Sequence, residues 1–143
     1  MLAKPRPLDA TAEAGAKAAA DAAGYDALYG RLGAKEVIAK SAELFSGGIA
    51  AVSSFGADSA VLLHMLARVD PALPVIFLDT GKHFEETLAY RDALAADFGL
   101  RNITVYEPLP SALVRGDPSG DLHRTDTDAC CNIRKVEPMA RAV

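Results

Sequence analysis

Two adjacent cysteines, Cys130 and Cys131, have the most distinctive chemistry in this sequence. On a helix, Arg134 follows Cys130 by one turn and Lys135 follows Cys131 by one turn, so each cation is expected beside the turn that carries a sulfur. A neighbouring cation favours the thiolate over the thiol, and thiolates are the ligands of iron–sulfur clusters and of other metal sites. The same pair also fits two small buried residues on an amphipathic helix, so the cysteines alone leave both interpretations open.

A structural disulfide between these two cysteines is not expected. Consecutive Cα atoms lie about 3.8 Å apart, which is below the separation of about 4.4 Å at which ordinary disulfides begin. Thiol or metal chemistry without disulfides is typical of a reducing compartment, so the pair favours a cytoplasmic protein.

A turn of small polar residues lies between an apolar strand predicted at 49–52 and a helix predicted over 57–69. Strand, turn and helix in this order leave free N–H groups at the helix N-terminus, which bind anions together with the helix dipole. Gly56 lets a ligand approach the backbone. The hydroxyl donors of the turn are Ser53, Ser54 and Ser59. A nucleotide phosphate or a sulfate is the expected guest, although a plain strand-to-helix connection with a serine N-cap fits as well.

A second polar turn follows residues 74–78, whose continuous apolar character predicts a buried parallel strand. The residues of this turn that suit a ligand are Asp79, Thr80 and Gly81. Asp79 also fits an ordinary residue at a strand end. Lys82 and His83 are interpreted as solvated residues at the start of a helix predicted over 83–98, and His64 in the preceding helix is interpreted as a core histidine.

The order of these elements predicts a doubly wound α/β fold with a parallel sheet. A third strand is predicted at 102–106, at the edge of the sheet. Ligands of such folds bind at the carboxyl ends of the strands, near a topological switch point. The turns at 53–59 and 79–81 are therefore expected at the same edge of the sheet.

The flanking segments are less regular. Residues 1–33 are predicted to be an N-terminal helical lead, with a marginal helix over 10–24 and a short helical turn over 25–32. The nucleotide-binding domain is predicted over 34–143, beginning with a helix at 34–45.

The polar residues 107–127 show no periodicity and predict a long loop of the kind that often covers a functional site. Three basic residues of this segment fit either anion contacts or solvated side chains: Arg115, His123 and Arg124. A helix that carries Cys130–Val136 is predicted to follow, with Pro138 limiting or kinking it.

Composition narrows the class of protein. A chain of 143 residues is one domain at most, and its net charge of −4 argues against a nucleic-acid partner. No run approaches the roughly 18 apolar residues of a membrane span, and the N-terminus lacks the apolar region of a secretory signal. We expect a cytoplasmic protein with neither membrane nor nucleic acid among its partners.

Taken together, the motifs resemble those of the sulfonucleotide reductases, which reduce adenylylsulfate or phosphoadenylylsulfate. The sequence S-S-F-G-A-D-S is similar to their modified pyrophosphatase (PP) loop, and F-L-D-T-G-K-H-F-E-E-T resembles their second nucleotide motif. The sequence C-C-N-I-R-K-V-E-P resembles the Cys-Cys-x-x-Arg-Lys-x-Glu-Pro signature of assimilatory adenylylsulfate reductases, and L-H-R-T-D-T-D-A before it also matches. The resemblance implies the PP-loop fold, also called adenine-nucleotide alpha-hydrolase-like.

The resemblance also implies a role for each matching residue. The phosphosulfate and ribose side of adenylylsulfate would lie against Ser53, Ser54, Phe55, Gly56, Ala57, Asp58 and Ser59. The adenosine side would be lined by Leu78, Asp79, Thr80 and Gly81. Cys130 and Cys131 would supply two of the four ligands of a [4Fe–4S] cluster. Lys135 would lie between the cluster and the substrate sulfate, and Arg134 would neutralise nearby negative charge.

Part of the family's chemistry has no counterpart in these residues. In the family, a C-terminal cysteine attacks the sulfate sulfur and releases AMP, after which thioredoxin cleaves the thiosulfonate and frees sulfite. The only cysteines here are the two proposed cluster ligands. We therefore expect a domain that is incomplete at its C-terminus, as a fragment or a truncated product, without reductase activity by itself. A homo-oligomer in which two chains each supply two cysteines is one way to complete a cluster.

Three other functions stay open. A phosphoadenylylsulfate reductase would bind a substrate with an additional 3′-phosphate, but its members without a cluster lack the cysteine pair. An adenylating enzyme like the small subunit of sulfate adenylyltransferase would carry Ser-Gly-Gly-x-Asp-Ser, and Phe55 stands where that loop has a glycine. The third possible function is that of a truncated nucleotide-binding module that catalyses no reaction.

Overall fold

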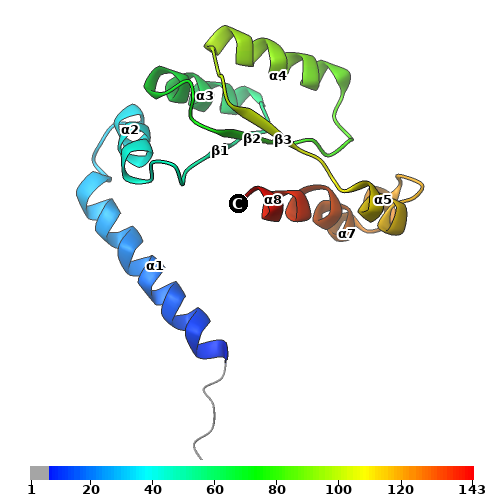
Figure 1. Cartoon of the computed structure of the whole chain (residues 1–143), viewed down its shortest axis with the longest axis horizontal. Coiled ribbons are helices and arrows are strands. Elements are labelled where there is room, and N and C mark those ends of the chain that lie inside the picture. Colours follow the sequence, from blue (N-terminus) through cyan, green and yellow to red (C-terminus); the bar gives the residue numbers. More distant parts are fainter. Residues whose placement is uncertain (1–6) are drawn as a thin grey trace, which may run out of the picture. The chain divides into compact units, whose positions relative to one another are not determined.

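The structure is a computed structural model, which describes the backbone of residues 7–143 and the side chains from residue 17 on (Figure 1). The chain divides into two compact units, Met1–Val37 and Ile38–Val143. The division falls slightly after the boundary predicted between residues 33 and 34, which stays a prediction, and residues 1–6 of the predicted lead lie outside the described part. Among the residues described, no helix is both long enough and apolar enough to cross a membrane.

A single helix, α1 (Pro7–Tyr29), makes up most of the first unit. The prediction of a marginal helix over 10–24 and a separate short turn over 25–32 is wrong in this respect. Gly24 costs about 1 kcal/mol relative to alanine within a helix, and the alanine-rich residues around it have the highest helix propensity. The glycine is therefore accommodated without a break.

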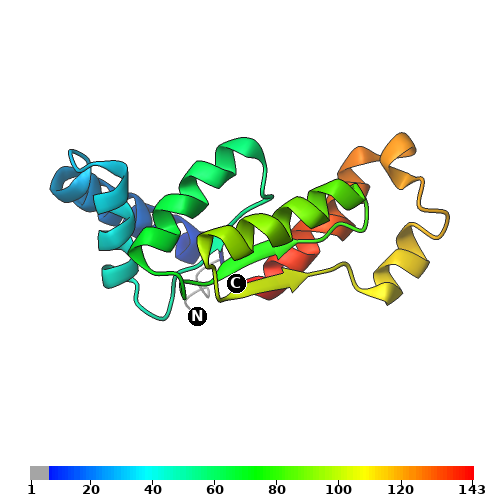
Figure 2. The same ribbon diagram turned by 90° about the horizontal axis from the view of Figure 1, so that it is seen from above.

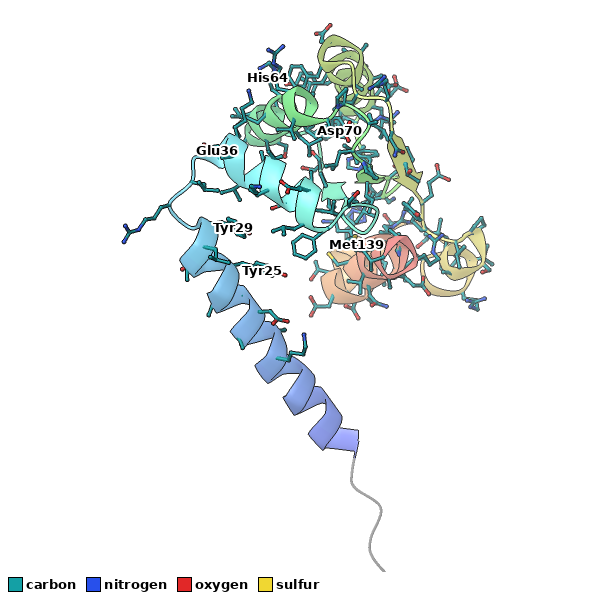
Figure 3. The ribbon with its side chains drawn as sticks, turned by 60° about the vertical axis from the view of Figure 1, so that its left-hand side comes forward. Tyr25, Tyr29, Glu36, His64, Asp70 and Met139 are labelled. Atoms are coloured by element: carbon teal, nitrogen blue, oxygen red, sulfur yellow. The ribbon has the colours of Figure 1, made fainter. Side chains whose placement is uncertain are left out.

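Local contacts stabilise the end of α1 and the start of the next helix, α2 (Ala34–Leu44). The rings of Tyr25 and Tyr29, one turn apart on α1, stack with centroids 6.4 Å apart (Figure 3). The Glu36 carboxylate accepts a hydrogen bond of 2.9 Å from the backbone N–H of Gly33. This bond satisfies a donor that the first turn of α2 would otherwise leave free.

Three parallel strands form the sheet of the second unit, and they are β1 (Ala51–Val52), β2 (Val75–Leu78) and β3 (Ile103–Tyr106). Their order is β1-β2-β3, and Ile76 of β2 lies opposite Val52 and Thr104. The predicted parallel sheet with its third strand at an edge is confirmed, although β1 is shorter than the predicted strand at 49–52. The order of the described strands contains no reversal, so the predicted switch point is not among them.

Helices cover both faces of this sheet, as the α/β prediction requires (Figure 1, Figure 2). Helices α3 (Ala57–Val69) and α4 (Glu85–Phe98) lie on one face, and α8 (Glu137–Ala142) lies against β2 and β3 on the other. The buried core cluster consists of Phe55, Leu63, Leu66, Leu73, Val75, Phe77 and Leu94. Gly99 ends α4 in the left-handed conformation, where a glycine costs least.

The segment predicted as one long loop over 107–127 contains two short helices, α5 (Pro110–Gly116) and α6 (Leu122–Thr125). Pro110 stands in the first turn of α5, where its missing N–H would have no intrahelical partner in any case. The Asp117 carboxylate accepts a hydrogen bond of 3.0 Å from the backbone N–H of Leu122 and so stabilises the start of α6. The loop prediction is wrong for these residues because helices this short show no hydrophobic period.

The cysteines lie on a continuous but irregular helix, which consists of α7 (Thr127–Cys131), the π-helical segment η1 (Asn132–Val136) and α8. It begins at Thr127, because the Asp126 carboxylate accepts from the N–H of Ala129 at 2.9 Å and so caps the helix. The proline ring of Pro138 would crowd the carbonyl of Arg134 in a regular α-helix. The wider π-helical turn gives this carbonyl room, so the helix continues past Pro138 instead of ending there.

Candidate nucleotide and thiol site

The turn after β1 is fixed by a buried aromatic ring. Among the described residues other than glycine, Phe55 alone has a positive φ, of 57°. Its side chain is 1% exposed, and its ring lies edge-on to Phe77 with centroids 5.7 Å apart. The Ser53 hydroxyl, itself buried, accepts a hydrogen bond of 3.0 Å from the N–H of Phe55. Phe55 therefore anchors the turn through the core, and its buried ring is not available to a ligand.

The start of α3 has the free donors that an anion site requires. Gly56 is the N-cap residue, and no side chain caps the helix, so the alternative of a serine N-cap is wrong. Ser54, Gly56, Ala57 and Asp58 are exposed and Ser59 is half-buried. The first N–H groups of α3 thus remain available to a phosphate or sulfate, with the positive end of the helix dipole behind them.

The turn after β2 is held by its own polar side chains. The Asp79 carboxylate accepts from the N–H of Gly81 at 2.9 Å, and the Thr80 hydroxyl accepts from the N–H of Lys82 at 3.3 Å. Gly81 has a φ of 66°, a conformation that favours glycine. The ordinary role of Asp79 at a strand end is therefore present, and Thr80, which is 8% exposed, forms the inner wall of the turn.

Lys82 is exposed, as the interpretation of a solvated residue requires, whereas His83 is half-buried, so the interpretation is wrong for His83. The Lys82 ammonium donates a hydrogen bond of 2.8 Å to the carbonyl of Gly120. The Nε2 atom of His83 lies 3.1 Å from the carbonyl oxygen of Leu78, and its ring lies 5.1 Å from that of Phe77. Both side chains thus connect the residues that follow this turn to other elements.

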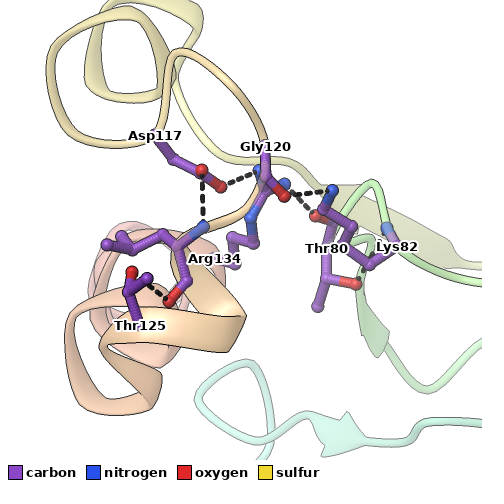
Figure 4. Close-up of polar contacts among 7 residues, drawn as sticks. Thr80, Lys82, Asp117, Gly120, Thr125 and Arg134 are labelled. Carbon is purple, nitrogen blue, oxygen red and sulfur yellow. Dashed lines mark hydrogen bonds and ion pairs between the residues drawn. The ribbon is translucent and has the colours of Figure 1, made fainter.

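A buried ion pair joins the cysteine helix to both neighbouring loops (Figure 4). Arg134 donates through Nη2 to the Asp117 carboxylate at 2.6 Å and through Nη1 to the carbonyl of Thr80 at 2.7 Å. The side chains of Arg134 and Asp117 are 7% and 1% exposed. The hydrogen bond from Arg134, followed by that from the N–H of Leu122, holds the pKa of Asp117 below its usual value, although burial acts in the opposite direction.

This pairing changes the expected role of Arg134. The sequence predicted its cation beside the sulfur of Cys130, but its Nη donors contact Asp117 and Thr80. Lys135 is exposed, and within residues 17–143 it forms no ion pair with a carboxylate. Of the two cations that follow the cysteines, Lys135 is therefore the one whose charge is not paired with a carboxylate.

Both cysteines line one open cavity of about 410 Å³. Cys130 is buried and Cys131 is exposed, and both are free thiols, which agrees with the prediction of no disulfide. The cationic side chains on the walls belong to Lys82, Arg134 and Lys135, and His123 and Thr80 contribute an imidazole and a hydroxyl. A cavity with thiols and an excess of positive charge suits an anionic ligand or a thiolate-bound metal.

The donor set agrees with only part of a four-ligand cluster site. The two cysteines provide soft thiolate donors of the kind that iron–sulfur clusters use. Within residues 17–143, however, no group of three or more histidine, cysteine or acidic side chains could hold a metal ion. The described residues therefore fit two ligands of a cluster and not a complete set.

A second cavity, of about 250 Å³, also adjoins Arg134. It is lined by Asp79, Thr80 and Gly81, and Arg134 and Thr80 line both cavities. The structure thus brings the turn after β2 and the cysteine helix together. The residues Ser53–Ser59 line neither cavity, and they are related to this site through the parallel pairing of β1 with β2.

The positions of several polar residues depend on tertiary contacts that cannot be predicted from the sequence. Asp117, which holds Arg134, was not singled out, because nothing in its neighbourhood distinguishes it from a solvated loop acid. His64 is exposed on α3 (Figure 3), so its interpretation as a core histidine is wrong, although its ring lies 5.1 Å from that of Phe98. Arg115, His123 and Arg124 are all exposed, and of these His123 lines the cysteine cavity.

The fold and the site define a class of protein before any relative is considered. It is a parallel α/β protein whose polar turns lie at the carboxyl ends of the strands, where nucleotides bind in such folds. The sequence profile of the phosphoadenosine phosphosulfate reductase domain matches residues 48–143. Since this match covers more than half of the chain, the chain belongs to that family.

Two relatives match along the whole chain. It is 68% identical to an adenosine 5′-phosphosulfate reductase of Mesorhizobium japonicum and 57% identical to a protein of the same name from a Chelativorans species. All of this chain is covered in both comparisons, but only 57% and 56% of the two relatives. The chain thus spans little more than half the length of these proteins.

The crystal structure of a phosphoadenylyl-sulfate reductase from Candida auris, in complex with phosphate, has the same fold. The TM-score is 0.68 at 24% sequence identity, and the match covers 83% of this chain and 59% of the other. At this identity the likeness shows the fold alone. It agrees with the predicted PP-loop type of α/β fold.

Proposed function

We propose that the chain provides the substrate-binding part of a thioredoxin-dependent adenylylsulfate reductase, which converts adenylylsulfate into sulfite and AMP. The observation that carries this proposal is the pair Cys130–Cys131 in a cationic cavity that shares a wall with the strand-end turn Asp79–Gly81. The names of the relatives that match the whole chain support the same substrate.

Different residues of the chain would bind different parts of adenylylsulfate. The uncapped start of α3 and the hydroxyls of Ser53, Ser54 and Ser59 would receive the phosphosulfate. Leu78 and the turn Asp79–Gly81 would contact the adenosine. Lys135 would stabilise the charge of the sulfate, since its ammonium group is exposed on the wall of the cysteine cavity.

The proposed cofactor is a [4Fe–4S] cluster, of which Cys130 and Cys131 would hold one side. When bound, such a cluster supplies a polarising group beside the cavity. The remaining ligands and the nucleophilic cysteine of the reaction would come from outside the described residues. Thioredoxin as the reductant, a homo-oligomer and a cytoplasmic location are parts of the same proposal.

A phosphoadenylylsulfate reductase is the second candidate. A Gloeobacter violaceus protein of that name is 39% identical over 78% of the chain. Its substrate carries a 3′-phosphate, so comparing the affinities for adenylylsulfate and its 3′-phosphorylated form separates the two functions. We expect the form without the 3′-phosphate to bind more tightly.

The test of the proposed function is sulfite release from adenylylsulfate in the presence of thioredoxin. The natural full-length protein is expected to release sulfite, and residues 1–143 alone are expected to bind adenylylsulfate without turnover. Failure of both proteins to bind adenylylsulfate would contradict the proposal.

A further inference from the structure

Two cations of the cysteine cavity are held by one short loop, here called the bridge loop, residues 117–120 between α5 and α6. Arg134 reaches its first residue, with 2.6 Å between Nη2 and Oδ2 of Asp117. Lys82 reaches its last residue, with 2.8 Å between Nζ and the carbonyl oxygen of Gly120 (Figure 4). Because Lys82 follows β2 and Arg134 lies on η1, the bridge loop joins two elements that are far apart in the chain.

The carboxylate of Asp117 uses both of its oxygens. Oδ2 accepts from Arg134, and Oδ1 accepts from the N–H of Leu122 at 3.0 Å. An asparagine at this position has one acceptor oxygen, so it cannot keep both bonds. The Asp117 side chain is 1% exposed, so water has little access to replace the lost acceptor.

The position of the Arg134 guanidinium depends on few contacts. Nη1 and Nη2 bind Thr80 and Asp117, whereas Nε is buried and, within the described chain, has no hydrogen-bond partner. Arg134 lines both the 410 Å³ cysteine cavity and the 250 Å³ strand-end cavity. Releasing one of its two contacts would therefore displace a wall that the two cavities share.

We propose that Asp117 is a positioning residue, which holds Arg134 against Thr80 so that this wall is in place before a sulfonucleotide binds. The proposal rests on the proposed function for the identity of the ligand. A preformed wall spares the binding step the cost of ordering it. Since Asp117 already neutralises Arg134, the guanidinium acts here through its position and not as a free positive charge.

The experiment compares Asp117→Asn with Asp121→Asn in the natural full-length protein. Asp121 is the matched control, because it is an exposed aspartate near the same loop and its side chain makes no capping bond. Isothermal titration measures the Kd for adenylylsulfate, and steady-state assays measure KM and kcat. In Asp117→Asn, Kd and KM are expected to rise about tenfold with kcat changing less than about twofold, as for an interaction lost equally in ground and transition states. Asp121→Asn is expected to match the wild type.

A double-mutant cycle with Arg134→Gln separates positioning from general destabilisation. If Asp117 acts through Arg134, Asp117→Asn has no further effect on Kd when Arg134 is already replaced. Additive effects would overturn the inference, and so would an unchanged Kd in the single variant. A lower Kd would also overturn it, because that result would mean that Asp117 only masks the charge of Arg134.

A wild-type protein that does not bind adenylylsulfate would refute the proposed function without deciding the role of Asp117. Hydrogen exchange then decides that role. Faster exchange of the amides of residues 80–82 in Asp117→Asn, with Asp121→Asn unchanged, supports the positioning of the wall. Equal exchange in the three proteins would overturn it.

Discussion

The turns after β1 and β2 lie at the same edge of the sheet but are fixed in different ways. The first turn is held from within, by the Ser53 hydroxyl two residues from the N–H of Phe55 and by the buried ring of Phe55. The second is also held from a distance, since Thr80 is bound by Arg134, which lies 54 residues further along the chain. Substitutions in the first turn should therefore affect the packing of the core. Substitutions in the second turn should affect the ion pair between Arg134 and Asp117.

The largest effect is expected where the two turns share a support. Phe77 of β2 contacts the ring of Phe55 from the first turn and that of His83 from the second, and Arg91 lies 4.9 Å above its ring. Phe77→Ala should lower the free energy of unfolding by about 3–5 kcal/mol, the usual cost of removing a buried aromatic ring. Urea denaturation measures this loss. A loss below about 1 kcal/mol would show that the turns do not depend on a common core.

Replacing Phe55 tests the first turn alone. Both Phe55→Ala and Phe55→Gly remove the ring and should cost about 3–5 kcal/mol. The positive φ of 57°, however, costs a residue with a Cβ about 1–2 kcal/mol, which glycine does not pay. Phe55→Gly should therefore be more stable than Phe55→Ala in urea denaturation, the reverse of the usual order. An equal or lower stability of the glycine variant would contradict a strained turn.

Acid tests the second turn. The pKa of Asp117 is lowered in the folded protein by its bonds to Arg134 and the N–H of Leu122, with the charge of Lys82 acting in the same direction. The ionised carboxylate therefore contributes its full stabilisation at pH values above the pKa of Asp117 in the unfolded chain, about 4. This stabilisation is lost as the pH falls through the lower pKa of the folded protein. Thermal melts of the wild type and Asp117→Asn should accordingly differ at pH 7 and converge in strong acid. A difference independent of pH would mean that the carboxylate charge does not stabilise the turn.

The smallest change concerns the two thiols beside the second turn. Cys131 is exposed and Cys130 is buried, so iodoacetamide should modify Cys131 faster, by on the order of tenfold. Peptide mass spectrometry of the metal-free protein measures both rates, and the difference should vanish in denaturant. Equal rates in the folded protein would contradict the burial of Cys130.

The first turn was the more predictable of the two because its residues are neighbours in the sequence. The parallel sheet, the edge position of its third strand and the start of α3 near Ala57 follow from apolar runs and small polar turns. The bond between Asp117 and Arg134 does not, because it depends on a π-helical turn and on two short helices without a visible period. Sequence spacing placed Arg134 beside a sulfur, whereas the fold directs its guanidinium to Thr80.

The central claim is that both turns and the cysteine helix form one sulfonucleotide site. Hydrogen exchange of the natural full-length protein, with and without adenylylsulfate, tests it most directly. The account predicts that the ligand slows exchange at residues 53–59, at 79–82 and along 127–136, and that the helix α1 is unchanged. Protection of only one turn, or of neither, would contradict a single site built from all three elements.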